Sequence, residues 1–267
     1  QVMFFVEGMM AVVAGIAAVF FLTDSPQKAK WLNDDEKAAL TKVMETEDAV
    51  RSSDGPSGVW KAMANWKVWY FTIIYFCLQI AVYGTTFYLP QQVAGLLGQS
   101  VGWQVGLVSA IPWLVGLFAC YLFGRRANTV RRRRGYGTVF FLLTGVFILG
   151  SALAGASGQP ILGILCITIA VASFLSVGPI TWSFPTAFLT GTAAAAGIGL
   201  INSLGNLGGF VAPIMRTAVN ESVPTDSGAW GVVSLGVFAF LAAAMFWATR
   251  FFRAKSDALL EEPTPQH

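Results

Sequence analysis

Apolar residues fill seven long stretches of this chain, and polar residues are concentrated between them. The hydrocarbon core of a bilayer is about 30 Å thick, and a helix of roughly 20 apolar residues spans it. Backbone polar groups in lipid must be hydrogen-bonded within their own segment, so each stretch is expected to be a helix. The predicted spans are residues 3–22, 68–89, 103–123, 138–155, 160–182, 193–215 and 230–249. The pattern therefore predicts an all-α membrane protein.

Basic residues are distributed unevenly over the connections between these stretches. Sixteen of the 17 Lys and Arg residues lie between the first and second stretches, between the third and fourth, or after the seventh. Loops rich in Lys and Arg are cytoplasmic in membrane proteins. All seven stretches therefore fit one alternating topology, which starts outside and ends in a cytoplasmic tail. We expect a multi-pass protein of the plasma (cytoplasmic) membrane.

Few residues in the sequence are suited to catalysis or metal binding. Cys77, Cys120 and Cys166 lie within apolar stretches and are expected to pack as small apolar side chains. The single histidine is the terminal His267, so no metal site, no cofactor and no enzyme active site is predicted. The sequence contains no GxxxxGK[ST] loop, so ATP is not expected to drive the protein directly. The arginine cluster is explained by topology, and no nucleic-acid partner is predicted.

A polar segment of about 45 residues separates the first stretch from the other six. Asn33 can cap a helix there, and Glu36 can complete a capping box. Leu40, Val43 and Met44 then form an apolar stripe. This helix either lies along the cytoplasmic membrane surface or is a solvated linker.

Short motifs resemble those of a known transporter family. They are FFVEG at residues 4–8, LTDSP at 22–26, TWSFP at 181–185 and INSLGNLGG at 201–209. The chain resembles the major facilitator superfamily, and more narrowly its anion:cation symporter family of tartrate, phthalate, hydroxyphenylacetate and sugar-acid permeases. The family usually has Leu-Pro where this chain has Met9-Met10.

The resemblance implies a major facilitator superfamily fold, of which this chain is the sixth helix plus the C-terminal half. The implied parts are the last helix of the N-terminal half (1–22), the cytoplasmic central loop (23–66), a six-helix bundle (67–252) and a cytoplasmic tail (253–267). The N-terminal six-helix half would then be missing from this chain.

Polar residues recur on one face of the second stretch, where Tyr75, Gln79 and Tyr83 are spaced four apart. At bilayer depth such residues either line a cavity or hydrogen-bond between helices. By resemblance, Tyr75 lies near a substrate-contacting position of sugar-acid permeases. In the fifth stretch, Trp182 lies between two prolines and forms either a wall of the site or a lipid-interface anchor.

The sixth stretch combines small residues, which let helices approach closely, with two amides four residues apart. Asn202 is implied by resemblance to contact substrate, and Asn206 either does the same or holds helices together. Arg216, at the outer end of this stretch, either attracts an anion or is an interfacial arginine. The candidate substrate-binding residues are Tyr75, Gln79, Tyr83, Trp182, Asn202, Ser203 and Asn206.

The connection between the third and fourth stretches departs from the family pattern. By resemblance it would carry a Gly-x-x-x-Asp-Arg motif with an acidic gating residue. Here Asn128 stands where that aspartate would be, while the basic residues remain. A weaker charge clamp on the inward face is expected. The candidate gating residues are Arg125, Asn128, Arg131 and Arg132.

Together, these features predict a secondary active transporter that takes up a small organic anion with protons by alternating access. The anion-binding and proton-coupling charges are expected in the missing half. Glu7, about one turn inside the first stretch, is expected to have an interfacial or structural role. A seven-helix receptor-like protein is the alternative, because it shares the topology. A retinal protein would need a lysine within 230–249, and there is none.

The topology can be tested by cysteine labelling in a chain whose three native cysteines are replaced by serine. Single cysteines at Ser53, Asn128 and Ser256 are expected to react with a membrane-impermeant maleimide only from the cytoplasmic side. A cysteine at Ser157 should react only from outside. The reverse pattern would contradict the argument from basic residues.

Overall fold

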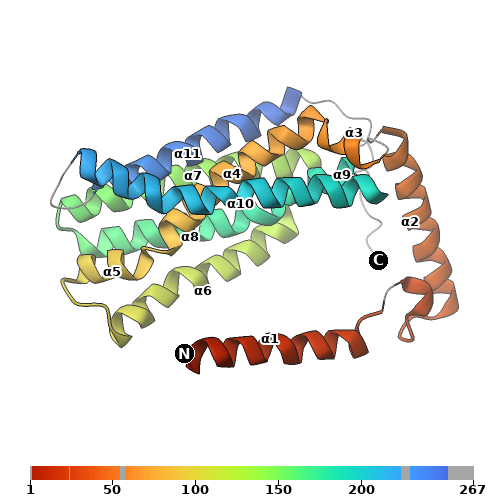
Figure 1. Ribbon diagram of the computed structural model, residues 1–267, viewed down its shortest axis with the longest axis horizontal. Helices are drawn as coiled ribbons and strands as arrows, with labels where there is room; N and C mark the ends of the chain where they lie inside the picture. Colours follow the sequence, from red (N-terminus) through yellow and green to blue (C-terminus); the bar gives the residue numbers. More distant parts are fainter. Residues whose placement is uncertain (1, 24, 55–57, 190, 224–228, 252–267) are drawn as a thin grey trace. The chain divides into compact units, whose positions relative to one another are not determined.

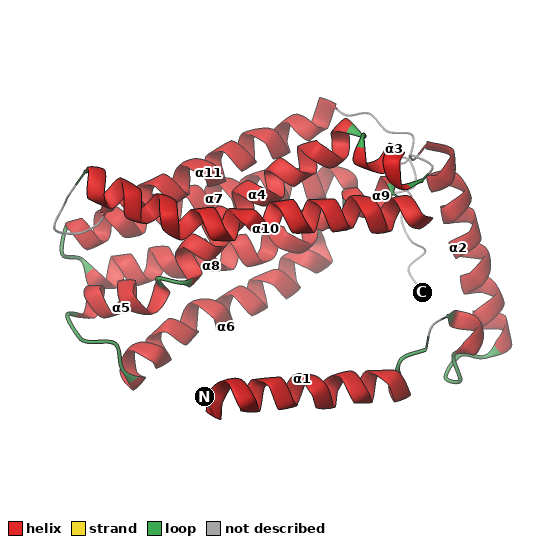
Figure 2. Ribbon diagram, viewed as in Figure 1, coloured by secondary structure: helices red, strands yellow, loops and turns green. Residues whose placement is uncertain are grey.

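The computed structural model describes residues 2–23, 25–54, 58–189, 191–223 and 229–251. These residues are almost entirely helical, with no strand among them, so the predicted all-α class is confirmed (Figure 2). The chain forms two compact units, Gln1–Val50 and Arg51–His267. The predicted tail at 253–267 lies outside the described residues.

The first unit contains a membrane-length apolar helix and the start of a polar one. Helix α1 is Val2–Phe21, a short 3-10 turn follows at Pro26–Lys28, and α2 is Asp34–Asp54. The predicted capping box is present. The backbone N–H of Glu36 donates to Asn33 Oδ1 at 2.8 Å, and that of Asn33 donates to Glu36 Oε2 at 3.0 Å. These bonds satisfy two donors that a helix start leaves without partners.

The apolar stripe of α2 is exposed within this unit. Leu40, Val43 and Met44 keep 40%, 53% and 46% of their surface accessible. The membrane-surface position of α2 therefore stays a prediction.

The second unit is built around long helices that pack side by side (Figure 1). Its elements are α3 Val59–Met63, α4 Trp66–Thr86, α5 Leu89–Leu97, α6 Trp103–Arg126, α7 Val130–Ala156, α8 Pro160–Trp182, α9 Pro185–Phe188, α10 Gly191–Ser222, α11 Ala229–Ala248 and the 3-10 turn Thr249–Phe251. Among the described residues, seven helices are long and apolar enough to cross a membrane: α1, α4, α6, α7, α8, α10 and α11. The seven predicted stretches are therefore confirmed as helices.

Several predicted stretches begin or end at other residues than the helices that contain them. Helix α4 ends at Thr86 rather than 89, and Pro90 lies in the first turn of a separate helix, α5, where the missing N–H of proline is tolerated. Helix α7 begins at Val130 rather than 138, because the Thr129 side chain caps it by accepting from the Arg132 N–H at 3.3 Å. Helix α10 continues beyond 215 to Ser222 and contains Pro213.

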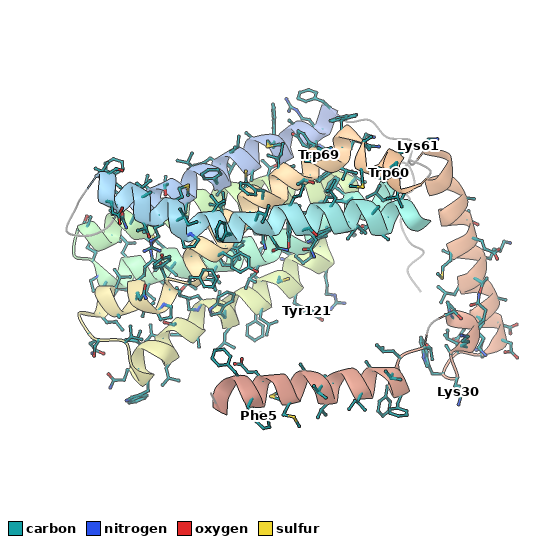
Figure 3. All side chains as sticks on the ribbon, viewed as in Figure 1. Phe5, Lys30, Trp60, Lys61, Trp69 and Tyr121 are labelled. Atoms are coloured by element: carbon teal, nitrogen blue, oxygen red, sulfur yellow. The ribbon has the colours of Figure 1, made fainter. Side chains whose placement is uncertain are left out.

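Exposed tryptophans surround the start of α4. Trp60, Trp66 and Trp69 keep 82%, 55% and 45% of their surface accessible, and Figure 3 labels two of them. The Trp69 Nε1 donates to the Met63 carbonyl at 2.8 Å. Tryptophan is enriched at both membrane–water interfaces, so this cluster supports a membrane boundary near α3. Which side of the membrane this boundary faces stays a prediction.

Helices α4 and α10 pack closely where α10 carries glycines. A Cβ atom at Gly205 would collide with the Tyr75 ring, and one at Gly208 would collide with the backbone carbonyl oxygen of Phe76. Small residues at such spacing bring helix backbones together in membrane proteins. The glycines thus set the separation of the two helices on which most predicted site residues lie.

We predict that Gly208→Ala destabilises the protein by about 1–3 kcal/mol, because the new methyl group meets backbone that cannot rotate away. Gly199→Ala on the same helix is the control, since nothing lies within 4 Å of its Cβ position. The measurement is thermal unfolding of both purified variants in detergent, followed by circular dichroism. Equal midpoints for the two variants would contradict the close approach.

Candidate functional site

Three amide side chains connect α4 with α10 inside their membrane-length segments. Gln79 Nε2 donates to Asn206 Oδ1. Asn206 Nδ2 in turn donates to Asn202 Oδ1 at 2.7 Å and to the Asn202 carbonyl at 2.8 Å. Gln79 is buried, Asn206 is half-buried and Asn202 is exposed. This amide row therefore runs from the helix interface to the open face of α10.

An aromatic pair lies next to the amide row. The rings of Tyr75 and Trp182 have centroids 4.9 Å apart at an interplanar angle of 65°, an edge-to-face contact between α4 and α8. The Tyr75 ring also lies against Gly205, the neighbour of Asn206 in the chain. Edge-to-face pairs of this kind are stabilising beyond their apolar burial, so they hold the Tyr75 ring in place.

The structure thus brings together five of the seven predicted substrate-binding residues: Tyr75, Gln79, Trp182, Asn202 and Asn206. Tyr83 lies two turns beyond Tyr75 on α4, against Gly209 and with its ring 5.5 Å from that of Phe87. Ser203 is exposed on α10 beside Asn202. Contact of these residues with substrate stays a prediction.

The two asparagines have different bonding. Asn206 uses both its oxygen and its nitrogen within the amide row, which is the interhelical role left open for it. Asn202 accepts through its oxygen, and within the described part of the chain its Nδ2 donates no hydrogen bond. An exposed amide N–H can donate to a carboxylate or hydroxyl oxygen of a ligand. Asn202 is therefore the member of the row that is able to bind a ligand.

The predicted gating residues surround the connection from α6 to α7. Arg132 Nη1 donates to Asn128 Oδ1 at 3.2 Å. Arg125 Nη1 donates at 2.8 Å to the hydroxyl of Tyr121, which is labelled in Figure 3. Arg131 is exposed in the first turn of α7. A neutral amide thus contacts a guanidinium at the position where the resemblance would place an aspartate.

Arg216 is buried within the bundle, which was not predicted from the sequence. Only 9% of its surface is accessible, and its Nη1 donates to the Gly84 carbonyl at 3.2 Å. The burial was missed because the sixth span was ended at 215, whereas α10 continues to Ser222 and carries Arg216 inside the bundle.

Among the described residues, no cluster of three or more His, Cys, Asp or Glu residues could hold a metal ion.

Comparisons with known proteins identify the kind of protein this chain resembles. The family model described as Major Facilitator Superfamily matches residues 1–213. The inner membrane transport protein RhmT of Escherichia coli (strain K12) is 36% identical over 94% of this chain and 56% of its own length. A putative tartrate transporter of Agrobacterium vitis is 33% identical over 85% of this chain and 51% of its own length.

A further relative, the putative metabolite transport protein NicT of Pseudomonas putida, is 30% identical over 86% of this chain and 52% of its own length. The chain therefore spans about half the length of the curated relatives it matches. The matched family and these relatives are transporters rather than enzymes or receptors.

The contact between Arg132 and Asn128 can be tested by Asn128→Asp in a twelve-helix carrier that contains this chain. The variant converts a hydrogen bond between a guanidinium and a neutral amide into an exposed ion pair, which contributes about 0.2–1 kcal/mol to the state in which the pair forms. Labelling of a cysteine at Ser203 from the cytoplasmic side should slow by up to about fivefold, and high salt should reduce the effect.

Gln99→Glu is the matched control for Asn128→Asp, because it adds the same charge on another exposed loop residue, between α5 and α6. If labelling is equally fast in Asn128→Asp, in Gln99→Glu and in the parent, this connection does not gate the cytoplasmic side.

Proposed function

Because the chain belongs to the Major Facilitator Superfamily, we propose that it forms seven spans of a secondary active transporter for a small organic anion. By resemblance these spans are the sixth helix (1–22), followed after the central loop (23–66) by the six-helix bundle of the C-terminal half (67–252). Transport would proceed by rocking this bundle against another six-helix bundle about a site near the midplane.

The exposed amide of Asn202 is the observation on which this proposal depends most. A polar side chain in the middle of a membrane span is costly in lipid and normally faces a bundle interior or a water-filled cavity. Asn202 and Ser203 are exposed on α10. Contact with a substrate cavity would give these groups the polar partners that lipid lacks.

The low burial of two helices supports the same assignment. Only 22% of the apolar segment is buried in α6 and in α10, whereas the value is 44–61% for α4, α7, α8 and α11. A second bundle that packs on α6 and α10 would cover these faces and enclose Asn202. The central cavity of the proposed carrier would then lie between the two bundles.

A hydroxylated carboxylate is the substrate class that fits the amide row best. Exposed N–H groups donate to carboxylate oxygens, and amides also hydrogen-bond to hydroxyl groups. The relatives named as putative tartrate transporters support this class. From residue 59 to residue 223 the sequence contains one acidic residue, Glu221, near the end of α10. We therefore place the proton-coupling acids of an anion–proton symporter in the other bundle.

The proposed membrane is the plasma (cytoplasmic) membrane, with the C-terminus in the cytoplasm. The name of the Escherichia coli relative, an inner membrane transport protein, supports this location. The basic connections support the orientation.

We predict that Asn202→Ala weakens binding of the transported anion by about 10- to 150-fold in a twelve-helix carrier that contains this chain. The estimate is the loss of one hydrogen bond to a charged group, about 1.5–3 kcal/mol. Uptake of labelled tartrate and of candidate sugar acids into proteoliposomes, with equilibrium binding to the purified carrier, measures the effect.

Asn206→Ala is the comparison for Asn202→Ala, because it leaves buried Gln79 without its partner. An unsatisfied buried polar group costs about 1–3 kcal/mol, so this variant should lose thermal stability more than affinity. If Asn202→Ala binds every candidate acid as the parent does, the substrate site does not lie on this face of α10.

A further inference from the structure

A cavity of about 580 Å³ with both polar and apolar lining lies at one end of the second unit, separate from the amide row. It is bounded by α5, the C-terminal end of α7, the first residues of α8 and α11, and Arg216 of α10. In Figure 1 this is the end of the unit that carries α5, opposite α3 and α9. Arg216 follows Asn206 by ten residues, which is about 15 Å along a helix. The cavity is therefore a distinct place in the bundle.

Arg216 contributes a buried positive charge to the wall of this cavity. Its accessible surface is only 9%, its Nη1 donates to the Gly84 carbonyl, and its Cζ lies 3.9 Å from the centroid of the Tyr88 ring. A carbonyl and an aromatic face orient a guanidinium but do not neutralise it. Within the described part of the chain, no carboxylate forms an ion pair with Arg216. A buried unpaired charge is costly, which favours an anion as its partner.

The rest of the cavity wall also suits an anion. Gln91 and Gln92 of α5 line it with amides, and no acidic residue is part of the lining. Pro160 and Ala229, the first residues of α8 and α11, line it as well. Pro160 has no N–H, and the Gly231 N–H in the first turn of α11 already donates to a side-chain oxygen, so these helix starts contribute only their dipoles. The guanidinium and the two glutamine amides therefore carry the attraction for an anion.

We propose that this cavity binds a small carboxylate anion through Arg216. A guanidinium has five N–H donors in a planar arrangement that matches a carboxylate, and one of them is used by Gly84. The volume lies within the range of small-molecule sites. At the outer end predicted by the topology, the cavity captures the anion before it reaches the amide row. This capture role rests on the proposed function, whereas binding of the anion does not.

Binding is tested with this chain itself, because the second unit contains the whole cavity. The probe is radiolabelled tartrate, a small dicarboxylate, added to the purified chain in lipid-free detergent and measured by equilibrium binding. Arg216→Gln should weaken binding by about 10- to 150-fold, and Arg216→Lys should weaken it less because the charge remains. Arg250→Gln removes an exposed cation over the Trp247 ring and should leave binding unchanged.

A second pair of variants tests the cavity without altering the arginine. Gly155 lines the cavity, and the nearest atom to its Cβ position, in Leu96, is 3.9 Å away. Gly155→Phe should therefore fold, occupy the space and reduce tartrate binding at least tenfold. Gly135→Phe on the same helix has nothing within 4 Å of its Cβ position and does not line the cavity, so it should bind like the parent.

Other outcomes separate this inference from the proposed function. If Arg216→Gln loses tartrate binding and Asn202→Ala keeps it, the cavity is the binding site. If Asn202→Ala loses binding and Arg216→Gln keeps it, the inference is wrong and the amide row is the site. Absence of tartrate binding to the parent chain overturns the inference alone, because the proposed transport requires a second bundle. If the chain in nanodiscs binds phosphatidylglycerol in a way that depends on Arg216 but binds no tartrate, the cavity holds a lipid headgroup and the inference is wrong.

Discussion

Helices α4 and α10 can form their contact only because α10 lacks side chains at the points where α4 presses against it. Cβ atoms at Gly205, Gly208 and Gly209 would all collide with α4. At this short separation Gln79 reaches Asn206 and the amide row forms. Membrane helices have little hydrophobic driving force for association, so close packing and hydrogen bonds between helices decide their arrangement. The position of the candidate site is thus a consequence of glycine spacing.

At the buried end of the amide row Gln79 has a hydrogen-bond partner, and at the other end Asn202 is exposed. Gln79 has its partner in Asn206, so the burial of Gln79 carries no penalty for a missing hydrogen bond. Asn206 directs its nitrogen toward Asn202, whose own nitrogen stays available. Because Asn206 links the two other amides, a ligand bound to Asn202 would be connected to the α4–α10 contact through hydrogen bonds. The interhelical role of Asn206 is therefore compatible with the proposed ligand contact at Asn202.

The fold was largely predictable from the sequence, and the site only in part. Apolar length defines membrane helices so strongly that all seven were found, and the capping box at Asn33 follows from local spacing alone. The pairing of Tyr75 with Trp182 and the cavity at Arg216 join segments distant in the sequence, and periodicity within one helix carries no information about them. The burial of Arg216 was missed because the end of α10 was placed too early.

The hydrogen bond between Arg132 and Asn128 has a consequence for the response of the cytoplasmic face to its surroundings. An amide gains or loses no proton over the physiological pH range. A change of cytoplasmic pH therefore does not act on this contact through the side chain at position 128. An aspartate at the same position would add one negative charge beside Arg132. With asparagine, the end of the bundle where α6 meets α7 is more positively charged than it would be with the aspartate.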